Sequence, residues 1–391
     1  MKNFFKNLKL KRRGITLLAG MHFYGNPSAK LKIVGVTGTN GKTTIATLLY
    51  NIATALGYKT GLIGTVENII AGEKRGATHT TPDSISLTKL LKEMVAKGCK
   101  YVFMEVSSHA LDQNRVAGVS FVGGIFTNLT HDHLDYHKNF ENYFGAKKKF
   151  FKMLSPEAFA LSNTDDEYGK KMLEGIKAKK YTYGFKNNAD FSEKLKTKLI
   201  GDFNMYNALA AYAALVLLGM DSEKVKKVIK DVEPPAGRFQ YFNLPNGVLV
   251  IVDYAHSPDA LENVLKTAQG IKKEGTKLIS IFGCGGDRDP IKREIMGKIG
   301  AELSDIAIFT SDNPRSEDPD KIIEQMKTGL SAKDFKKVRT IANRREAILE
   351  GIKLAQKGDI ILCAGKGHED YQEIKGVRYH FNDLEEFRKI L

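Results

Sequence analysis

A glycine-rich segment near the start of the chain contains residue types that bind phosphate. Glycines let backbone N–H groups approach phosphate oxygens, Lys42 can balance the charge of the β- and γ-phosphates, and the Thr43 hydroxyl can hold Mg²⁺. The spacing departs from the strict phosphate-loop pattern, because Val36 occupies the first glycine position and glycines occur at 35 and 38 instead. The segment still predicts an ATP-binding loop, whose residues are Gly38, Thr39, Asn40, Gly41, Lys42, Thr43 and Thr44.

Two later segments contain side chains that could hold a metal ion. Glu105 follows an apolar run and would lie at the carboxyl edge of a sheet, where ligands of such folds collect. A magnesium ligand is the natural role for it, and a surface glutamate at a strand end is the alternative. Residues 128–137 are dense in His and Asp, which on their own could indicate zinc. Magnesium is favoured because the phosphate loop requires hard oxygen ligands and no cysteine is near, and one histidine could complete its shell.

The apolar runs around these segments predict the elements that position them. Residues 31–36 are typical of a buried strand, and residues 43–56 of a helix that follows the glycine-rich turn. This alternation continues and indicates an α/β domain with a mostly parallel sheet covered on both faces. The further strands are predicted at 60–63, 101–105, 122–126 and 158–161, and the helices at 84–97, 140–154 and 204–219, the last buried and closed by Gly219.

The pattern breaks around residues 232–237, where two consecutive prolines and a glycine indicate a linker, so we place a domain boundary near Pro234. A length of 391 residues also favours two domains. The predicted organisation is an N-terminal extension (1–30), a central P-loop ATP-binding domain (31–233) and a C-terminal Rossmann-like α/β domain (234–391). In the last of these, strands are predicted at 248–252, 278–282, 306–310, 338–341 and 360–363.

Composition narrows the class of protein. Hydrophobic residues make up 42% of the chain, with 36 Gly and 10 Pro, as in a globular protein and unlike a disordered or fibrous one. The three cysteines are far apart, which indicates neither a disulfide framework nor a thiolate zinc site and favours the cytoplasm. No apolar run is long enough to span a membrane. A formal charge of +15 could suggest a nucleic-acid partner, but the basic residues are spread along the chain, so a small polyanionic substrate is favoured.

Six motifs, in their order and approximate spacing, resemble those of the Mur ligases. They are the loop at 38–43, the run 105–109, the segment 128–137, Phe203-Asn204-Met205-Tyr206-Asn207, Gly237-Arg238 and Asp253-Tyr254-Ala255-His256. The resemblance extends from about residue 25 to the end of the chain. It implies an ATP-dependent ligase that forms an amide bond through an acyl phosphate, with ATP, two Mg²⁺ ions and small-molecule substrates, in the synthesis of a cell-wall precursor.

The resemblance also implies roles for individual residues. Thr43 and Glu105 would bind one Mg²⁺, His133 would help to bind another, and a carbamylated Lys147 would bridge them, with Lys42 beside the transferred phosphoryl group. By residue type alone, Lys147 would instead belong to a solvated basic face. Contacts to the nucleotide would come from Asn204, Asn207, Arg238, Asp253 and His256, and contacts to the acceptor from Thr80, Thr81, Ser107 and Arg115.

The C-terminal motifs resemble the amino-acid pocket of the family members that add diaminopimelate. Diaminopimelate ends in a second carboxylate and ammonium, which suit the Arg315 guanidinium and an acidic partner such as Glu369, whereas lysine has no distal carboxylate. In isolation the same residues would be an Asn-Pro turn with a surface arginine. The motifs are Arg288, Asp312-Asn313-Pro314-Arg315 and Gly365-Lys366-Gly367-His368-Glu369.

One departure from the family and three alternatives bear on this interpretation. Such ligases carry an N-terminal domain that holds the uridine diphosphate (UDP) of the acceptor, and about 30 residues before the first strand leave no room for it. We therefore expect either an acceptor without UDP or a separate chain that supplies UDP binding.

A folylpolyglutamate-synthetase-like ligase is an alternative function, although the 312–315 segment argues against it. A nucleic-acid-binding ATPase and a non-catalytic binding module are weaker alternatives, and the last is disfavoured by the intact Lys42, Glu105, His133 and Lys147.

Overall fold

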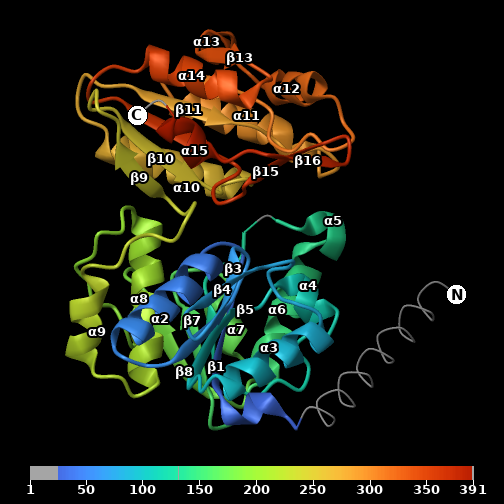
Figure 1. The fold of residues 1–391 in the computed structure, drawn as a ribbon, viewed down its shortest axis with the longest axis vertical. Helices are drawn as coiled ribbons and strands as arrows, with labels where there is room; N and C mark the ends of the chain where they lie inside the picture. Colours follow the sequence, from blue (N-terminus) through green and yellow to red (C-terminus); the bar gives the residue numbers. More distant parts are fainter. Residues whose placement is uncertain (1–24, 131, 390–391) are drawn as a thin grey trace, which may run out of the picture. The chain divides into compact units, whose positions relative to one another are not determined.

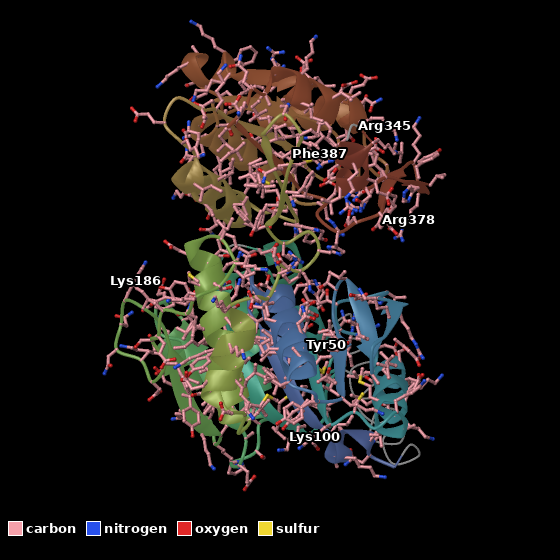
Figure 2. All side chains as sticks on the ribbon, turned by 60° about the vertical axis from the view of Figure 1, so that its left-hand side comes forward. Tyr50, Lys100, Lys186, Arg345, Arg378 and Phe387 are labelled. Atoms are coloured by element: carbon pink, nitrogen blue, oxygen red, sulfur yellow. The ribbon has the colours of Figure 1, made fainter. Side chains whose placement is uncertain are left out.

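The computed structural model describes residues 25–130 and 132–389. Residues 1–24 of the predicted N-terminal extension lie outside this part of the chain. The chain divides into two compact units, one ending at Glu233 and the other beginning at Pro234, and each has its own sheet (Figure 1). Among the side chains labelled in Figure 2, Tyr50 and Phe387 are buried in the first and second unit respectively, whereas Lys186 and Arg378 are exposed.

The first unit contains an eight-stranded sheet in the order β4-β3-β2-β5-β1-β6-β7-β8. From β2 to β8 along this order all neighbours are parallel, whereas β3 and β4 add an antiparallel hairpin at one edge. The central strands are continuous apolar runs, as expected of parallel strands that are buried on both faces. The strands are β1 (Lys32–Thr37), β2 (Thr60–Ile63), β3 (Glu67–Ile70), β4 (Glu73–Gly76), β5 (Tyr101–Glu105), β6 (Phe121–Phe126), β7 (Phe159–Asn163) and β8 (Lys179–Tyr183).

Helices cover both faces of this sheet (Figure 1). One apolar core lies between the sheet and α2 (Lys42–Ala55), α8 (Asp202–Leu217) and α9 (Ser222–Ile229). The helix α8 is buried almost all round, because it packs on α2, on α9 and on the sheet. A second core lies on the other face, beneath α3 (Ser84–Ala96), α4 (Ser108–Asp112), α6 (Phe140–Lys152) and α7 (Gly169–Leu173). Two short elements complete the unit, the 3₁₀ helix η1 (Pro27–Lys30) and α5 (Leu134–His137).

The second unit contains a six-stranded sheet in the order β13-β12-β11-β14-β10-β9, in which only the edge strand β9 is antiparallel. A separate hairpin is formed by β15 and β16. The strands are β9 (Gln240–Asn243), β10 (Leu249–Asp253), β11 (Leu278–Phe282), β12 (Ile306–Phe309), β13 (Val338–Thr340), β14 (Ile360–Ala364), β15 (Tyr371–Ile374) and β16 (Val377–His380). The helices are α10 (Pro258–Ile271), α11 (Ile291–Leu303), α12 (Pro319–Lys327), α13 (Ala332–Phe335), α14 (Arg344–Leu354) and α15 (Asp383–Arg388).

The predicted α/β fold class is confirmed, with a mostly parallel sheet in each unit. All strands and helices that were predicted by residue range are present, with ends that differ by at most two residues; the helix predicted at 204–219, for example, is α8 at Asp202–Leu217. The hairpins β3–β4 and β15–β16 and the strands β8 and β9 were not predicted. No helix in the described ranges combines the length and the apolar character that a membrane span requires.

Candidate active site

The predicted phosphate loop, residues 38–41, connects β1 to α2 at the carboxyl edge of the first sheet. Parallel pairing places Val36 of β1 beside Glu105 of β5, and Thr37 of β1 beside Phe126 of β6. The carboxyl ends of three adjacent strands therefore meet at this loop. Side chains just beyond these ends can reach a common ligand, as is usual in open α/β sheets.

Two glycines of the loop have no room for a side chain. A Cβ on Gly38 would lie 1.8 Å from the Oγ1 of Thr127, and a Cβ on Gly41 would lie 2.5 Å from the Oδ1 of Asn207. Gly41 also has a φ of +86°, which disfavours residues with a Cβ. The loop is thus held close to the segment after β6 and to α8.

Residues of the segment after β6 fix the phosphate loop by hydrogen bonds to backbone groups of the loop. The Thr39 N–H donates to the Asn128 carbonyl and the Asn40 N–H to the Asn128 Oδ1, both at 2.9 Å. The Thr127 hydroxyl donates to the Asn40 carbonyl at 2.6 Å. These bonds hold the loop against the segment after β6, and Lys42, the first residue of α2, follows the loop.

Lys42 and Lys147 both point to the carbonyl oxygen of Gly38. The Lys42 Nζ donates to it at 2.9 Å and to the Thr39 carbonyl at 2.6 Å, and the Lys147 Nζ donates to it at 2.6 Å. Lys147 is only 1% exposed, so the alternative of a solvated basic face is wrong for this residue. Burial, with a smaller contribution from the charge of Lys42, holds the pKa of Lys147 well below its ordinary value.

Glu105 is almost completely buried and is held by threonines. Its Oε2 accepts from the Thr43 hydroxyl at 2.9 Å and from the Thr65 hydroxyl at 3.0 Å, and its Oε1 accepts from the Thr65 N–H at 2.7 Å. The Thr65 hydroxyl is also 3.0 Å from that of Thr80. Thr65 is not among the predicted site residues. Its only signal was its place just after the strand predicted at 60–63, at the same sheet edge as Glu105.

The residues predicted to contact the acceptor lie close to Glu105 and are linked to it by hydrogen bonds. The Thr81 hydroxyl donates to the Glu105 carbonyl at 2.8 Å and accepts from the Ser107 N–H at 3.1 Å. The Arg115 guanidinium donates to the Thr81 carbonyl at 2.9 Å. The structure therefore brings Thr81, Ser107 and Arg115 together, and Thr80 joins them through Thr65.

His133 of the first unit has a second histidine and an aspartate as neighbours. His133 lies next to His109, with 4.8 Å between the ring centroids, and its Nε2 is 3.4 Å from the Asp132 carboxylate. Burial lowers the pKa of His133 to about 4, assisted by Lys42 and opposed by Asp132, so that its imidazole is neutral at pH 7. Within residues 25–130 and 132–389, no three His, Cys, Asp or Glu side chains form a group that could hold a metal ion by themselves.

The two asparagines predicted to contact the nucleotide lie on the first turns of α8. The Asn207 amide donates to the Asn204 Oδ1 at 3.1 Å, and the Asn204 amide donates to the Ile200 carbonyl at 2.9 Å. Both are buried, and Asn207 faces Gly41 at the end of the phosphate loop. Thr44 of the loop motif is buried within α2.

Asp253 lies at the carboxyl end of β10 in the second unit. Its carboxylate accepts from the Phe239 N–H at 2.6 Å and from the Ala255 N–H at 2.7 Å. Burial nevertheless raises the pKa of Asp253 to about 6, although the charge of Arg238 and both of these hydrogen bonds favour the ionised form.

Arg238 and His256 lie on either side of Tyr254. The Arg238 guanidinium carbon is 4.6 Å from the centre of the Tyr254 ring, and the His256 Nδ1 is 2.9 Å from the Tyr254 carbonyl oxygen. The structure thus brings Arg238, Asp253 and His256 together at one end of β10.

The predicted amino-acid motif at 312–315 forms a loop that the β15 strand holds in place. The Glu373 N–H donates to the Asn313 Oδ1 at 2.9 Å, and the Gln372 amide donates to the Asp312 carbonyl at 2.7 Å. The Arg315 N–H donates to the Glu373 carbonyl at 3.0 Å. Arg315 itself has a φ of +52°, which these backbone bonds enforce.

Glu369 lies against this loop. Its Oε2 accepts from the Asn313 amide at 2.9 Å and from the Lys366 ammonium at 3.0 Å. Gly365 has a φ of +113°, and a Cβ there would lie 2.8 Å from the Asp312 Oδ2. Lys366 belongs to the motif at 365–369 but was not predicted as a site residue. It forms one cluster with Asn313 and Glu369.

The two predicted arginines of this pocket lie on either side of Gly285. A Cβ on Gly285 would lie 2.9 Å from the Arg315 Nη1 and 3.7 Å from the Arg288 Cγ. The Arg315 Nη1 also donates to the Gly286 carbonyl at 2.7 Å, whereas Arg288 is exposed. Arg315 is therefore fixed, and Arg288 has more freedom.

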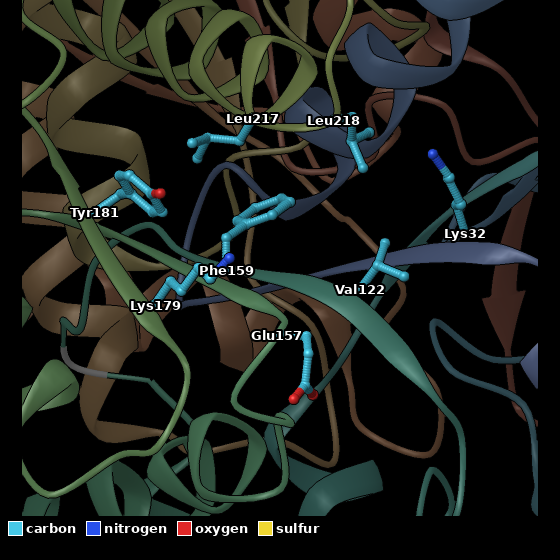
Figure 3. Close-up of a pocket in the computed structure, with 8 residues that line it drawn as sticks. All are labelled: Lys32, Val122, Glu157, Phe159, Lys179, Tyr181, Leu217 and Leu218. Carbon is cyan, nitrogen blue, oxygen red and sulfur yellow. The ribbon is translucent and has the colours of Figure 1, made fainter.

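A hollow of about 280 Å³ lies at the opposite edge of the first sheet, where β1, β7 and β8 begin (Figure 3). Apolar, basic and acidic side chains line it. They are Lys32, Val122, Glu157, Phe159, Lys179, Tyr181, Leu217 and Leu218, and none of them was predicted to belong to a site.

Comparisons with known proteins agree with the motifs. A profile described as the Mur ligase middle domain matches residues 36–215, and one described as the Mur ligase, glutamate ligase domain matches residues 237–367. The protein from Bacteroides thetaiotaomicron named UDP-N-acetylmuramoyl-L-alanyl-D-glutamate–2,6-diaminopimelate ligase is 51% identical over 385 residues, which cover 94% of this chain and 80% of the relative. The protein of the same name from Cytophaga hutchinsonii is 52% identical over 379 residues, with 93% and 78% covered.

Solved structures show the same fold. A structure of a diaminopimelate ligase with the same name has a TM-score of 0.63 and 35% identity, over 92% of this chain and 78% of the other. The Mycobacterium tuberculosis folylpolyglutamate synthase, solved with ADP and AMPPCP, has a TM-score of 0.72 at 17% identity, over 91% and 93% of the two chains. At that identity the second likeness concerns the fold alone.

Proposed function

Because this chain belongs to the Mur ligases, a family of ATP-dependent enzymes that form amide bonds, we propose that it joins meso-diaminopimelate to a muramoyl-peptide acceptor in the synthesis of a peptidoglycan precursor. The observation that supports this amino acid most directly is the hydrogen-bonded cluster of Asn313 and Glu369 with the Arg315 guanidinium on the same loop. A carboxylate and a guanidinium held together in this way complement the distal ammonium and carboxylate of diaminopimelate.

The proposed reaction has two steps. A carboxylate oxygen of the acceptor attacks the γ-phosphorus of ATP, the bond to the β-phosphate oxygen breaks, and an acyl phosphate and ADP form. The amine of the amino acid then attacks the acyl carbon, inorganic phosphate leaves, and the amine loses a proton as the amide forms. In both steps the protein mainly positions the reactants and neutralises charge.

In this proposal the nucleotide phosphates lie on the loop at 38–44, beside Lys42. Lys42 would exchange the carbonyl groups of its own loop for phosphate oxygens. The proposed contacts to the rest of the nucleotide are Asn204 and Asn207 from the first unit and Arg238, Asp253 and His256 from the second. The proposed contacts to the acceptor are Thr80, Thr81, Ser107 and Arg115, which adjoin Glu105.

The residues near the loop also fit magnesium. Bound Mg²⁺, two ions in the proposal, would neutralise charge on the transferred phosphoryl group. Thr43 and Glu105 present hard oxygen atoms 2.9 Å apart beside the loop and would hold one ion together with phosphate oxygens and water. The neutral imidazole of His133 would help to hold the second.

We further propose that Lys147 carries a carbamate. The Lys147 ammonium would first lose one proton, and its neutral Nζ would then add to CO₂, forming a C–N bond and releasing a second proton, so that a buried positive charge becomes a negative one. The support is geometric, because the Nζ atoms of Lys147 and Lys42 both donate to the Gly38 carbonyl and Lys147 is 1% exposed. Two ammonium groups at one carbonyl repel each other, whereas a carbamate would attract Lys42 and could bind metal ions.

A matrix of phosphate-release measurements with Mg-ATP tests the proposed function. The amino-acid arms are meso-diaminopimelate, L-lysine and L-glutamate. The acceptor arms are the UDP-muramoyl dipeptide, the same dipeptide without UDP, and a folate. We expect release that depends on both a muramoyl peptide and diaminopimelate. Release that depends on folate and glutamate would instead support the folylpolyglutamate-synthetase alternative.

The two muramoyl arms decide the role of UDP. Equal kcat/KM in the two arms would show that UDP does not contribute to recognition of the acceptor. A loss of about a hundredfold in kcat/KM on removing UDP, or about 3 kcal/mol, would show that UDP is recognised. Recovery of that loss on adding a second protein would point to a separate UDP-binding chain.

A further inference from the structure

We infer that Lys366 is a positioning residue of the amino-acid site, which holds Glu369 and Asn313 in the arrangement that receives the distal ammonium of the amino acid. The inference rests on the proposed function of the second unit. It assigns a role to a lysine that the substrate itself need not touch.

Lys366 is completely buried, and its ammonium lies among the polar side chains of the pocket. Its Nζ is 3.0 Å from the Glu369 Oε2, 3.4 Å from the Asn313 Oδ1 and 3.9 Å from the Asp312 Oδ1. A buried ammonium is stable only with such partners. The partners are in turn constrained by it, because each is drawn toward one fixed charge.

These contacts determine which atoms of the cluster face a ligand. The Asn313 Oδ1 accepts from the Glu373 N–H and from Lys366, so the Asn313 amide group has to point its Nδ2 at the Glu369 Oε2. The Glu369 Oε2 therefore receives two donors. The Glu369 Oε1 has only a long contact to the Tyr254 hydroxyl, at 3.5 Å, and is the oxygen that can receive an ammonium.

The net charge of these side chains also favours the binding of an ammonium group. The carboxylates of Asp312 and Glu369 and the ammonium of Lys366 leave the cluster with one net negative charge. An incoming ammonium would neutralise it. Without Lys366, two carboxylates would face each other, and Glu369 would be pushed away from the Asn313 amide.

The backbone that carries Lys366 is also fixed. Arg344 donates to the Ala364 carbonyl at 2.9 Å and forms a buried, two-bonded ion pair with Asp383, at 2.7 and 2.8 Å. Gly365, the next residue, cannot carry a side chain beside Asp312. The Lys366 side chain therefore starts from a rigid point, as a positioning role requires.

The test is steady-state kinetics on the whole chain with Lys366→Met, at saturating ATP and acceptor. The matched control is Lys337→Met, because Lys337 is another hydrogen-bonded lysine of the second unit; it is partly buried, 3.0 Å from the Ala301 carbonyl and 3.4 Å from Asp334. We expect Lys366→Met to raise KM for diaminopimelate about tenfold while KM for ATP changes less than about twofold. Lys366→Arg should recover part of the loss, and the control should change neither constant.

A second comparison separates positioning from general stability. In a Glu369→Gln background, adding Lys366→Met should raise KM for diaminopimelate by less than about threefold, because the group that Lys366 orients is already gone. If Lys366→Met alone does not fold, the inference is tested by comparing the double variant with Glu369→Gln. A wild-type KM in Lys366→Met, or an equal rise for ATP and amino acid together with a lowered Tm, would overturn the inference. If the wild type rejects diaminopimelate, the proposed substrate is wrong, and the same comparison with the accepted amino acid then decides on Lys366.

Discussion

At the residue scale, the first unit gathers two lysines around one carbonyl and two hydroxyls around one carboxylate. The sequence identified three of these side chains, Lys42, Thr43 and Glu105, because the phosphate loop has a local pattern and Glu105 ends an apolar run. It could not identify Thr65, which is 40 residues from Glu105 and reaches it only through the pairing of β2 with β5. The burial of Lys147 was equally hidden, since two more lysines follow it in the chain, and the residue was selected only through the family resemblance.

Lys147→Ala should remove most of the ligase activity and leave the fold intact. The reason is that the lost group would order metal ions and charge rather than fill an apolar core. The measurement is phosphate release in carbonate-free buffer, with and without added bicarbonate, beside thermal unfolding. Bicarbonate should stimulate the wild type and not the variant. Near-normal turnover by a folded Lys147→Ala protein would rule out the carbamate.

Asp253 should titrate with a midpoint near 6, well above the roughly 3.9 of an unfolded aspartate. A raised pKa in the folded state means that folding favours the protonated form, so stability from this group falls as the pH rises from about 4 to about 6. Relative to Asp253→Asn, the wild type should lose about 3 kcal/mol of unfolding free energy over that window. The checks are a ¹³C titration of the Asp253 carboxyl and denaturant unfolding at pH 4 and pH 7. A midpoint below about 4.5 would contradict the expectation.

At the scale of elements, the sequence predicted most of the buried strands and missed two strands that are wholly exposed. The strands β1, β5, β11 and β14 are continuous apolar runs, and burial on both faces leaves little choice of conformation. In β4 and β16 every residue is exposed, so neither has an apolar pattern to reveal it. The missed β15–β16 hairpin matters for function, because β15 holds the 312–315 loop through three hydrogen bonds.

We expect Arg315, which this loop holds in place, to determine which amino acid the enzyme uses. A fixed guanidinium left without a carboxylate partner costs several kcal/mol, enough to reject lysine by a hundredfold or more. The measurement is kcat/KM for meso-diaminopimelate and for L-lysine in the wild type and in Arg315→Ala. The preference should collapse in the variant through loss of diaminopimelate. Equal values in the wild type, or a preference for lysine that persists in the variant, would refute this role.

At the scale of the whole molecule, each unit has its own sheet and core, and the chain passes from one to the other between Glu233 and Pro234. The proposed reaction needs both, because the phosphate loop and Glu105 belong to the first unit and the amino-acid loop to the second. The linker was predictable because two prolines and a glycine interrupt the strand and helix pattern at this point.

Residues 25–233 and 234–391, produced separately, should therefore each fold. We expect a cooperative thermal transition for each fragment, since each buries a core large enough for an independent domain. Neither fragment should release phosphate in response to diaminopimelate. A fragment that lacks a transition would show that its unit depends on the other for stability.

The lysines at the Gly38 carbonyl have a further consequence for the catalytic cycle. Lys42 makes two hydrogen bonds to its own loop, to the carbonyl groups of Gly38 and Thr39. These carbonyl oxygens would compete with nucleotide phosphates for the Lys42 ammonium. Such competition would weaken the binding of ADP and ATP alike, and it would give the lysine an alternative partner at the moment when product leaves. We therefore expect it to favour turnover over tight retention of the nucleotide.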